Sequence, residues 1–422
     1  MRKLLLFFIV ALLLTGTVIA PVLAQEAGEY DREIGVVLDG MAVDFDVAPL
    51  IQNNRTLVPF RAVAEALNIN VRWDNDRRQV IAGDDSGSVI LTVDSPYAQV
   101  NKSVVEMDTA PIIIQGRTLV PLRFFAEAFG CEVDWKQETR TVVMISPPKI
   151  MSVTGFYALG DKESSSWTDL FAKNYPETGR GNTDIITDLA LGWFSLDEKG
   201  NLLNRSTTGW QRPEGWERVI EAARHYKMDT EMLIHITDGG GQLSRFLNDN
   251  QAVERAIEDI VKEARLYNGV NLDFEGLGWN EDGEELQNTR FNFNLFVEKL
   301  SRELKKESLG LTLTLHAPNS SYQGYDYEYL GKAADYIIIM AYDYGIKPEP
   351  VQMVRQAVEM ARETVPGEKL LLGISAASET PESLAVKIGI ARRYKLEGIA
   401  VWRLGLLSDN MWDVLRARIA RP

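Results

Sequence analysis

Short apolar runs alternate with helix-like stretches from Ser152 to the end of the chain. Apolar runs of this length joined by helices are typical of a parallel sheet. The pattern predicts eight strands, at 153–158, 189–194, 232–236, 270–275, 311–316, 336–342, 370–375 and 399–402. Helices are expected between them at 216–226, 252–267, 291–306, 350–364 and 381–394.

Eight such units fit an α/β fold, a (β/α)8 TIM barrel, which we expect over residues 152–422. The alternative is a doubly wound open sheet. The strand count and the lack of a Gly-x-Gly-x-x-Gly fingerprint in the sequence argue against that alternative. In a TIM barrel the active site lies at the C-terminal ends of the strands, so those ends are where we look for chemistry.

The fourth predicted strand carries a polar face. Alternate side chains of a strand point the same way, and here one face presents Gly269, Asn271, Asp273 and Glu275. Unpaired acids are almost never fully buried, because desolvating a carboxylate is costly. Asp273 and Glu275 are about 6.6 Å apart along the strand, close enough for each to change the pKa of the other. They are therefore candidate catalytic residues, and the alternative is an edge strand with a solvated acidic face.

Residues 31–146 contain an internal repeat. The sequence Arg-Thr-Leu-Val-Pro occurs at 55–59 and again at 117–121, an offset of 62 residues (117 − 55). Trp73 and Trp135 keep the same offset. Such self-similarity indicates two copies of one supersecondary unit, and each copy is expected to form a hairpin, a short helix and another hairpin. The sequence thus predicts a smaller α+β domain, joined to the barrel by a Pro-Pro linker at 147–151.

Residues 1–24 have the features of a signal peptide. Arg2 and Lys3 form a charged start, an uninterrupted apolar run of eleven residues covers 4–14, and Val22-Leu23-Ala24 is a plausible cleavage site. The alternative is an uncleaved membrane anchor, but eleven residues are too few to span a bilayer. We therefore expect a secreted or envelope-associated protein.

Composition and charge argue against several kinds of binding partner and bound group. The net charge of −15 argues against a nucleic-acid partner, because phosphate backbones select basic surfaces. Cys131 is the only cysteine, so no intrachain disulfide can form. No His/Cys/Asp cluster in the sequence has metal-ligand spacing, and we expect neither a metal nor another cofactor.

The segment Asn268-Gly269-Val270-Asn271-Leu272-Asp273-Phe274-Glu275 resembles a known signature. Glycoside hydrolase family 18, the chitinase-like family, carries Asp-Gly-x-Asp-x-Asp-x-Glu on strand four of its (β/α)8 barrel. The Gly, the last Asp and the Glu match, whereas Asn268 and Asn271 replace the first two Asp. The Gly-Val-Asn-x-Asp-Phe-Glu form is similar to the branch that acts on spore and cell-wall peptidoglycan.

The segment 31–146 resembles the copper amine oxidase-like N-terminal domain, a stalk module of exported bacterial proteins. No copper site is expected there, because all three histidines lie outside the segment and copper sites favour imidazole or sulfur ligands. The roles we consider for this stalk are contact with the cell wall, as an attachment, and presentation of the substrate.

The resemblance to family 18 implies a role for each matching residue. Glu275 would protonate the glycosidic oxygen, with a pKa raised by burial beside a second carboxylate. Asp273 would orient the 2-acetamido group, with support from Asn271, and Tyr342 would donate a hydrogen bond to the acetamido oxygen. Trp402 would form the floor under the sugar. Further candidates for substrate binding or groove lining are Asp343, Tyr157, Phe156 and Trp193.

Structural roles compete with several of these assignments. Tyr342 and Asp343, at the end of the sixth strand, would in the alternative pair with helix termini. Trp402 would be an ordinary core residue, since Trp is usually largely buried. His316 ends a strand too, and a structural role is the expectation for it.

The implied function is an exported glycosidase that cleaves β-1,4 bonds after N-acetylglucosamine in peptidoglycan, including that of the spore cortex, with the substrate's own acetamido group as nucleophile. The segment 375–399 has room for one helix, whereas deep-groove chitinases of the family carry an inserted domain there. A more open cleft, suited to a bulky cross-linked polymer, is therefore expected. The alternatives are a chitinase, a non-catalytic glycan-binding lectin and a structural envelope or spore-coat protein.

Overall fold

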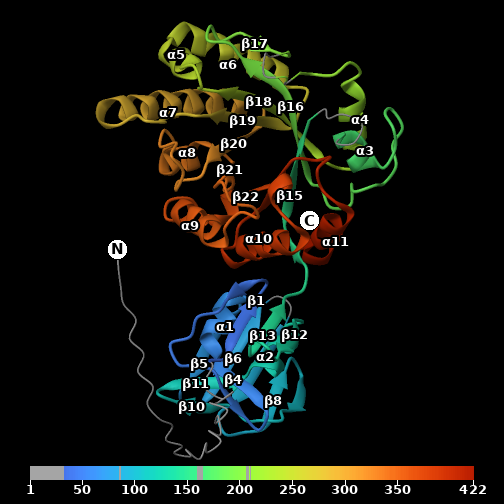
Figure 1. Ribbon diagram of the computed structural model, residues 1–422, viewed down its shortest axis with the longest axis vertical. Helices are drawn as coiled ribbons and strands as arrows, with labels where there is room; N and C mark the ends of the chain where they lie inside the picture. Colours follow the sequence, from blue (N-terminus) through green and yellow to red (C-terminus); the bar gives the residue numbers. More distant parts are fainter. Residues whose placement is uncertain (1–32, 85–86, 159–164, 206–208, 210) are drawn as a thin grey trace, which may run out of the picture. The chain divides into compact units, whose positions relative to one another are not determined.

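The computed structural model describes residues 33–84, 87–158, 165–205, 209 and 211–422 (Figure 1). The predicted signal peptide at 1–24 lies outside these residues. Within the described ranges, no helix combines the length and the apolar character needed to cross a membrane.

Eight parallel strands form a closed barrel from Ser152 onward. In chain order they are β15 (Ser152–Tyr157), β16 (Asp188–Leu196), β18 (Asp229–Thr237), β19 (Gly269–Glu275), β20 (Gly310–His316), β21 (Tyr336–Met340), β22 (Leu370–Ser375) and β23 (Gly398–Trp402). Each strand pairs with the next, and β15 also pairs in parallel with β23, which closes the sheet. The predicted TIM barrel is confirmed, and the open sheet is excluded.

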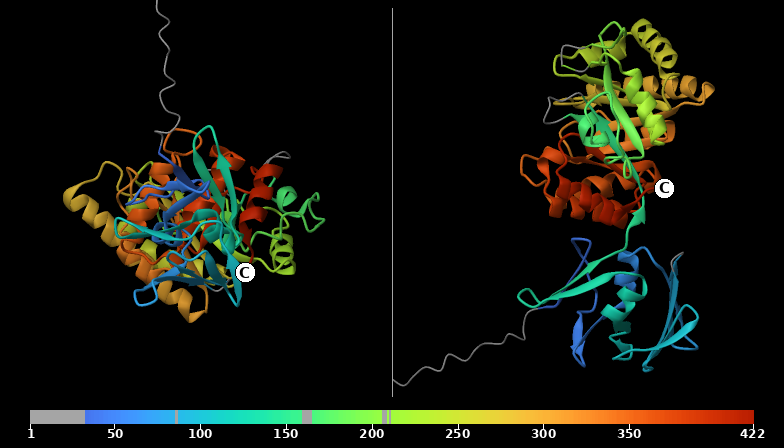
Figure 2. Two further views of the ribbon diagram at one scale, coloured as in Figure 1. Left: turned by 90° about the horizontal axis from the view of Figure 1, so that it is seen from below. Right: turned by 90° about the vertical axis from the view of Figure 1, so that its right-hand side faces the viewer.

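Helices surround the barrel strands (Figure 2). They are α3 (Ser166–Phe171), α4 (Glu217–His225), α5 (Gln242–Asn248), α6 (Asn250–Ala264), α7 (Gly283–Lys306), α8 (Tyr327–Ala333), α9 (Val351–Arg362), α10 (Pro381–Arg393) and α11 (Asp409–Arg418), with short 3-10 helices at Gly367–Lys369 and Ala376–Ser378. The side chain of Asp249 caps α6 by accepting hydrogen bonds from the backbone N–H groups of Gln251 and Ala252, which the helix itself leaves unsatisfied. Between β22 and β23, α10 is the one α-helix, as the sequence predicts. The short strand β17 (Leu202–Leu203) extends β16 in an antiparallel pair.

The barrel has an outer and an inner core. Val270, Leu272 and Phe274 of β19 belong to the large apolar cluster between the strands and the helices. A smaller inner cluster fills the barrel, with members that come from alternate positions on six strands: Phe156, Ala190, Leu233, Ile338, Leu371 and Ala400. This alternation leaves the polar face of β19 directed into the barrel.

The stalk is built from two sheet-and-helix copies. The first contains a hairpin of β3 (Leu50–Gln52) and β4 (Arg55–Pro59), then α1 (Phe60–Ala66), then a hairpin of β5 (Asn70–Asp74) and β6 (Gln79–Asp84). The second contains β10 (Ile112–Ile114), β11 (Arg117–Pro121), α2 (Leu122–Ala128), β12 (Glu132–Lys136) and β13 (Thr141–Ile145). The remaining strands are β1 (Gly35–Leu38), β2 (Met41–Ala42), β7 (Gly87–Thr92), β8 (Tyr97–Val100) and β9 (Ser103–Glu106).

The two copies are related by an approximate two-fold arrangement. The repeated Arg-Thr-Leu-Val-Pro strands, β4 and β11, pair antiparallel with Val58 opposite Val120. Arg55 forms an ion pair of 2.5 Å with Asp108 of the other copy, and Arg117 forms the equivalent pair of 2.5 Å with Asp46. The hairpin–helix–hairpin unit predicted from the repeat is thus confirmed in both copies.

The linker also contains structure. Within it, β14 (Lys149–Ile150) pairs in parallel with β24 (Ile419–Ala420) at the end of the chain. A short strand was not expected beside two prolines. Its pairing uses only two residues, which is below the length that a sequence pattern identifies.

Candidate active site

The polar face of β19 is buried, not solvated. β19 lies between β18 and β20. Asn271 is 0% exposed and Asp273 2% exposed, whereas 31% of the Glu275 side chain is exposed at the end of the strand. The alternative of an edge strand with a solvated acidic face is therefore wrong.

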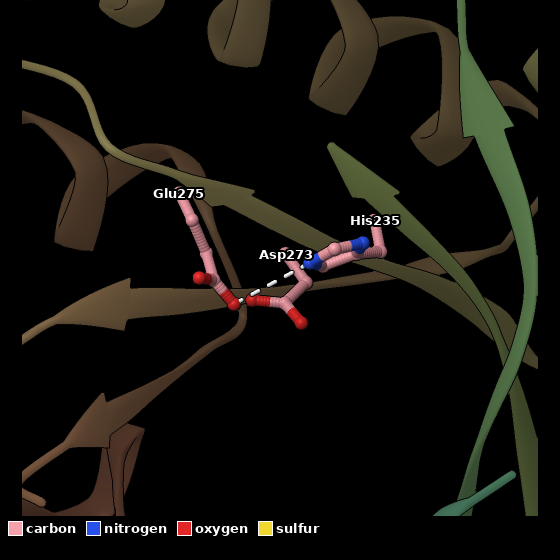
Figure 3. Close-up of side chains that lie close together, drawn as sticks. All are labelled: His235, Asp273 and Glu275. Carbon is pink, nitrogen blue, oxygen red and sulfur yellow. Dashed lines mark ion pairs between the residues drawn. The ribbon is translucent and has the colours of Figure 1, made fainter. Parts of the chain in front are cut away.

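A histidine completes a compact group with the two acids. His235 of β18 is directly opposite Asp273 in the strand register, and its Nε2 is 3.5 Å from Oε1 of Glu275. The side chains of His235, Asp273 and Glu275 point toward one another (Figure 3), and one ligand atom from each lies within 4.8 Å of the others. The sequence analysis did not single out His235. Leu233 of the same strand faces inward, and His235 follows it by two positions. Alternation along the strand could therefore have identified His235 as an inward-facing residue.

The two acids differ in proton affinity. Burial, reinforced by the charge of Glu275, raises the pKa of Asp273 well above its usual value. Burial also raises the pKa of Glu275, but the hydrogen bond and charge of His235 and the charge of His316 outweigh it, so the net pKa of Glu275 is lowered. The sequence predicted a raised pKa for Glu275, and this prediction is wrong. It took no account of His235 and His316, which lower the pKa of Glu275. The order of the two pKa values favours a proton on Asp273 over one on Glu275.

One atom of Asp273 has no protein partner. Oδ1 of Asp273 is buried and accepts or donates no hydrogen bond among the described residues. Buried polar atoms are almost always hydrogen-bonded, so this atom suits a polar group of a ligand.

Asn271 is held from its sides. Its Nδ2 donates to Oε2 of Glu231 on β18 at 2.8 Å, and its Oδ1 accepts from the Thr314 hydroxyl of β20 at 2.8 Å. The Thr312 hydroxyl also donates to Glu231, and burial raises the pKa of Glu231 to about 7. The expected support of Asp273 by a hydrogen bond from Asn271 is therefore corrected: the amide is bound to Glu231 and Thr314 instead.

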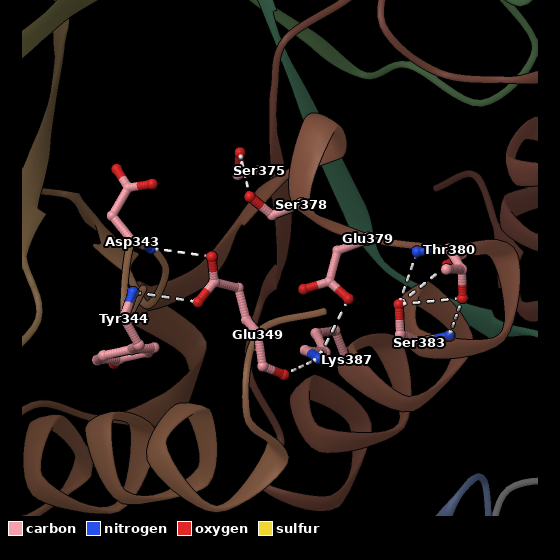
Figure 4. Close-up of polar contacts among 9 residues, drawn as sticks. All are labelled: Asp343, Tyr344, Glu349, Ser375, Ser378, Glu379, Thr380, Ser383 and Lys387. Atoms are coloured by element: carbon pink, nitrogen blue, oxygen red, sulfur yellow. Dashed lines mark hydrogen bonds and ion pairs between the residues drawn. The ribbon is translucent and has the colours of Figure 1, made fainter. Parts of the chain in front are cut away.

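The residues after β21 form an anchored turn. The strand ends at Met340, two residues earlier than predicted, and Asp343 adopts a left-handed conformation with φ 64°. The buried carboxylate of Glu349 accepts hydrogen bonds from the backbone N–H groups of Asp343 (3.0 Å) and Tyr344 (3.2 Å) (Figure 4). Lys387 donates to the backbone carbonyl of Glu349 at 2.5 Å. Glu349 thus fixes the turn that carries Tyr342 and Asp343, a role that the sequence analysis missed.

Tyr342 lies close to the acid pair, whereas Asp343 is exposed. Burial, followed by the negative charges of Asp273 and Glu275, raises the pKa of Tyr342 well above its usual value, so its phenol remains a hydrogen-bond donor. The side chain of Asp343 is exposed. Its pKa is nevertheless raised, first by partial burial and then by the negative charges of Glu349 and Glu275.

The aromatic candidates separate by strand face. Trp402 is half-buried and packs edge-on against Phe156 with ring centroids 5.2 Å apart, next to the inner cluster. Tyr157 points the other way: it is 1% exposed in the outer core, 6.4 Å from Trp193. The expectation that Tyr157 and Trp193 line the groove is wrong, because neighbouring residues of a strand face opposite sides.

Further aromatic side chains extend from the site. His316 of β20 stacks on Tyr322 with ring centroids 3.9 Å apart. Trp279 forms a β-bridge with Tyr322 and is 60% exposed. The sequence analysis overlooked Trp279 and Tyr322, although Trp279 lies only four residues after Glu275. Exposed aromatic rings at a site of this kind suit the apolar faces of sugars.

The group His235, Asp273 and Glu275 is also compact enough to hold a cation. A metal ligand must be deprotonated, and Asp273 holds its proton far more strongly than an ordinary aspartate. The donor set therefore fits a proton-sharing pair better than a metal centre.

Comparisons with known proteins agree with this geometry. Residues 164–380 match the family model Glycosyl hydrolases family 18, and residues 37–144 match Copper amine oxidase N-terminal domain. The uncharacterized glycosylase YvbX of Bacillus subtilis is 20% identical over 303 residues, which cover 54% of this chain and 83% of that protein. The cortical fragment-lytic enzyme of Bacillus subtilis is 28% identical over 223 residues, 48% of this chain and 47% of that enzyme.

Among solved structures, the chitinase of Chromobacterium violaceum superimposes with a TM-score of 0.52 at 20% identity, over 63% of this chain and 98% of that one. The spore cortex-lytic enzyme SleL of Bacillus megaterium does so with a TM-score of 0.52 at 16% identity, over 67% of this chain and 77% of that one. These likenesses concern the barrel fold, and the chain spans about half the length of the cortical fragment-lytic enzyme. With the family match covering half of its residues, the chain belongs to glycosyl hydrolase family 18, a family of glycosidases.

Proposed function

We propose that the protein is an exported glycosidase that cleaves β-1,4 bonds after N-acetylglucosamine in peptidoglycan, with retention of configuration. The observation that carries the proposal is the placement of the buried Asp273 beside the partly exposed Glu275 at the C-terminal end of β19, with pKa values shifted in opposite directions. Family membership supports glycosidase chemistry, and the residues 1–24 support export.

The two acids come from one face of one strand, so they do not suit opposite sides of a sugar. A two-carboxylate retaining enzyme needs its carboxyl groups about 5–5.5 Å apart across the scissile bond. Membership of family 18 implies instead that the substrate's acetamido oxygen is the nucleophile, and it attacks the anomeric carbon as the glycosidic bond breaks. Glu275 transfers its proton to the leaving oxygen, which takes the electron pair of the broken bond. Glu275 then deprotonates a water molecule. This water attacks the anomeric carbon of the cyclised intermediate from the face that the leaving group occupied, so the configuration is retained.

Asp273 links substrate binding to this step. With substrate absent the proton lies on Asp273, and Glu275 is ionised. When the acetamido N–H donates to the Asp273 carboxylate, Asp273 gives its proton to Glu275, which becomes the general acid. The unpartnered Oδ1 of Asp273 supports this binding role. Tyr342, kept protonated by its raised pKa, donates to the acetamido oxygen and aligns it for attack.

Several features favour peptidoglycan as the glycan. The Asn271 form of the motif is similar to the peptidoglycan-acting branch, and two of the similar proteins are named for lysis of spore cortex or its fragments. The single helix between β22 and β23 supports an open cleft. The exposed Trp279 beside Tyr322 offers a platform for sugar units beyond the scissile bond.

The proposal is tested by turnover of a soluble N-acetylglucosamine-containing glycan. Glu275→Gln keeps the shape of the side chain but cannot act as the acid, and general acid catalysis is worth roughly 10²–10⁴-fold. We expect a loss of kcat in that range. Glu284→Gln makes the same chemical change at an exposed position of α7 and should leave kcat unchanged. Turnover by Glu275→Gln within about threefold of the parent would refute the assignment.

A further inference from the structure

The stalk contains a cavity that the proposed chemistry does not use. It has a volume of about 730 Å³ and lies at α1, β5 and the turn between β10 and β11. Ligand sites usually measure about 300–1,000 Å³. We call this cavity the first-repeat groove and define it by the lining residues Asp46, Arg61, Ala62, Glu65, Trp73 and Arg117.

The first-repeat groove combines an aromatic ring with both hydrogen-bond donors and acceptors. Trp73 is half-buried, whereas Arg61 and Glu65 are exposed at the groove. Arg117 Nε donates to Oδ2 of Asp46 at 2.5 Å and keeps the pKa of that carboxyl below its usual range. Three carboxylates, of Asp44, Asp46 and Glu65, line the groove with two guanidinium groups, of Arg61 and Arg117, and this excess of acids suits a neutral polar ligand better than an anion.

The second copy of the repeat has a larger side chain at the position equivalent to Ala62. Phe124 is at the position equivalent to Ala62, by the offset of 62 residues, and it packs against the stalk core. A small side chain in the first copy therefore leaves space where the second copy carries a phenyl ring.

The equivalent tryptophans, Trp73 and Trp135, differ in the hydrogen bonding of their indole N–H groups. In the second copy the indole N–H of Trp135 donates to Oε1 of Gln137 at 2.7 Å. Asn75 takes the place of Gln137 in the first copy, and among the described residues no group accepts a hydrogen bond from the Trp73 indole. The first copy therefore combines a smaller side chain with an unused donor, whereas the second copy combines a phenyl ring with an indole N–H that is hydrogen-bonded.

We propose that the first-repeat groove is a non-catalytic binding site for a glycan strand of the same N-acetylated polymer that the barrel cleaves. A sugar ring packs its apolar face on Trp73. Hydroxyl and acetamido groups bind the indole N–H, the Asp46 carboxylate and the Arg117 guanidinium. The choice of polymer rests on the proposed function, whereas the existence of the site rests on the stalk alone.

The experiment measures co-sedimentation of the full chain with purified sacculi and, in parallel, turnover of a soluble glycan. Ala62→Phe installs the side chain that the second copy already accommodates, so it should fold and fill the groove. We expect its dissociation constant for sacculi to rise at least tenfold with unchanged soluble turnover. Trp73→Phe, which removes only the indole N–H and part of the ring, should weaken binding about threefold. Phe124→Leu, which keeps a large apolar side chain in the other copy, is the matched control and should bind as the parent does.

Thermal unfolding confirms that each variant is folded. A folded Ala62→Phe variant that binds sacculi like the parent overturns the proposal. The glycan is distinguished from the stem peptide by sacculi stripped of peptide: equal loss on stripped and intact material supports the proposal, and loss on intact material only overturns it. If the parent fails to hydrolyse the soluble glycan, the proposed function fails, while the comparison of parent with Ala62→Phe still reports on the groove.

Discussion

His235 should set the pH at which the enzyme loses its catalytic proton. Its imidazole favours the ionised form of Glu275. Replacing it by Leu removes both the hydrogen bond and any positive charge, so the pKa of Glu275 rises. The carboxyl pair then keeps its proton to higher pH. Because the basic limb of kcat/KM reports loss of the essential acid's proton, that limb should move upward in His235→Leu.

The size of the shift follows from the geometry. Nε2 of His235 is 3.5 Å from Oε1 of Glu275. A protonated imidazole and a carboxylate at that separation would interact by about 1.2 kcal/mol in a water-like dielectric and by about 4.7 kcal/mol at an effective dielectric constant of about 20. One pKa unit corresponds to about 1.4 kcal/mol, so these two energies correspond to a shift of about 0.9–3.4 units in the pKa of Glu275. With 31% of the Glu275 side chain exposed, water screens the pair, and we expect a shift of about one unit.

The assay is the pH profile of kcat/KM on a soluble glycan. His235→Gln keeps an N–H donor without the charge and should fall between the parent and His235→Leu. His225→Leu, at an exposed position of α4, controls for the loss of a histidine elsewhere. A basic limb that stays in place or moves downward in His235→Leu would show that His235 does not act on Glu275.

Three further outcomes are expected. A substrate with a free amine in place of the acetamide should not be cleaved, and thiazoline mimics of the cyclised intermediate should inhibit; efficient hydrolysis of the amine would return Asp343 to consideration. A chain beginning at Pro147 should cut soluble fragments normally but clear intact sacculi less well, and equal clearance would argue against a targeting stalk. Because the folded pKa of Glu231 is raised to about 7, folding stability should decrease as pH rises from about 4.5 to 7, by up to about 3 kcal/mol; in Glu231→Gln, denaturant titrations should lose this slope.

Periodicity alone predicted the barrel because its strands are buried on both faces. The eight predicted strands differ from the observed barrel strands by at most three residues at either end, and the prediction 370–375 coincides with β22. The six-residue α3 and seven-residue α5 and α8 escaped prediction because they are too short to show helical spacing. The stalk was predicted well because its repeat supplies two readings of one unit.

The site was predicted where it depends on one strand and missed where it depends on two. Asp273 and Glu275 share β19, so their common face follows from alternation. His235 and Glu231 approach from β18, and that contact depends on the register between strands, which a single sequence does not encode. The opposite pKa shifts of the two acids were missed for the same reason. Tyr157 was misplaced because its neighbour Phe156 faces the inside of the barrel, which directs Tyr157 into the outer core.

The most direct test of the account is proton NMR of the first product released from peptidoglycan glycan strands. Acetamido-assisted cleavage after N-acetylglucosamine predicts a new reducing end of N-acetylglucosamine that appears first as the β-anomer, before mutarotation. A first product with the α-configuration, or with N-acetylmuramic acid at the new reducing end, would contradict the acetamido-assisted mechanism or the position of the cut.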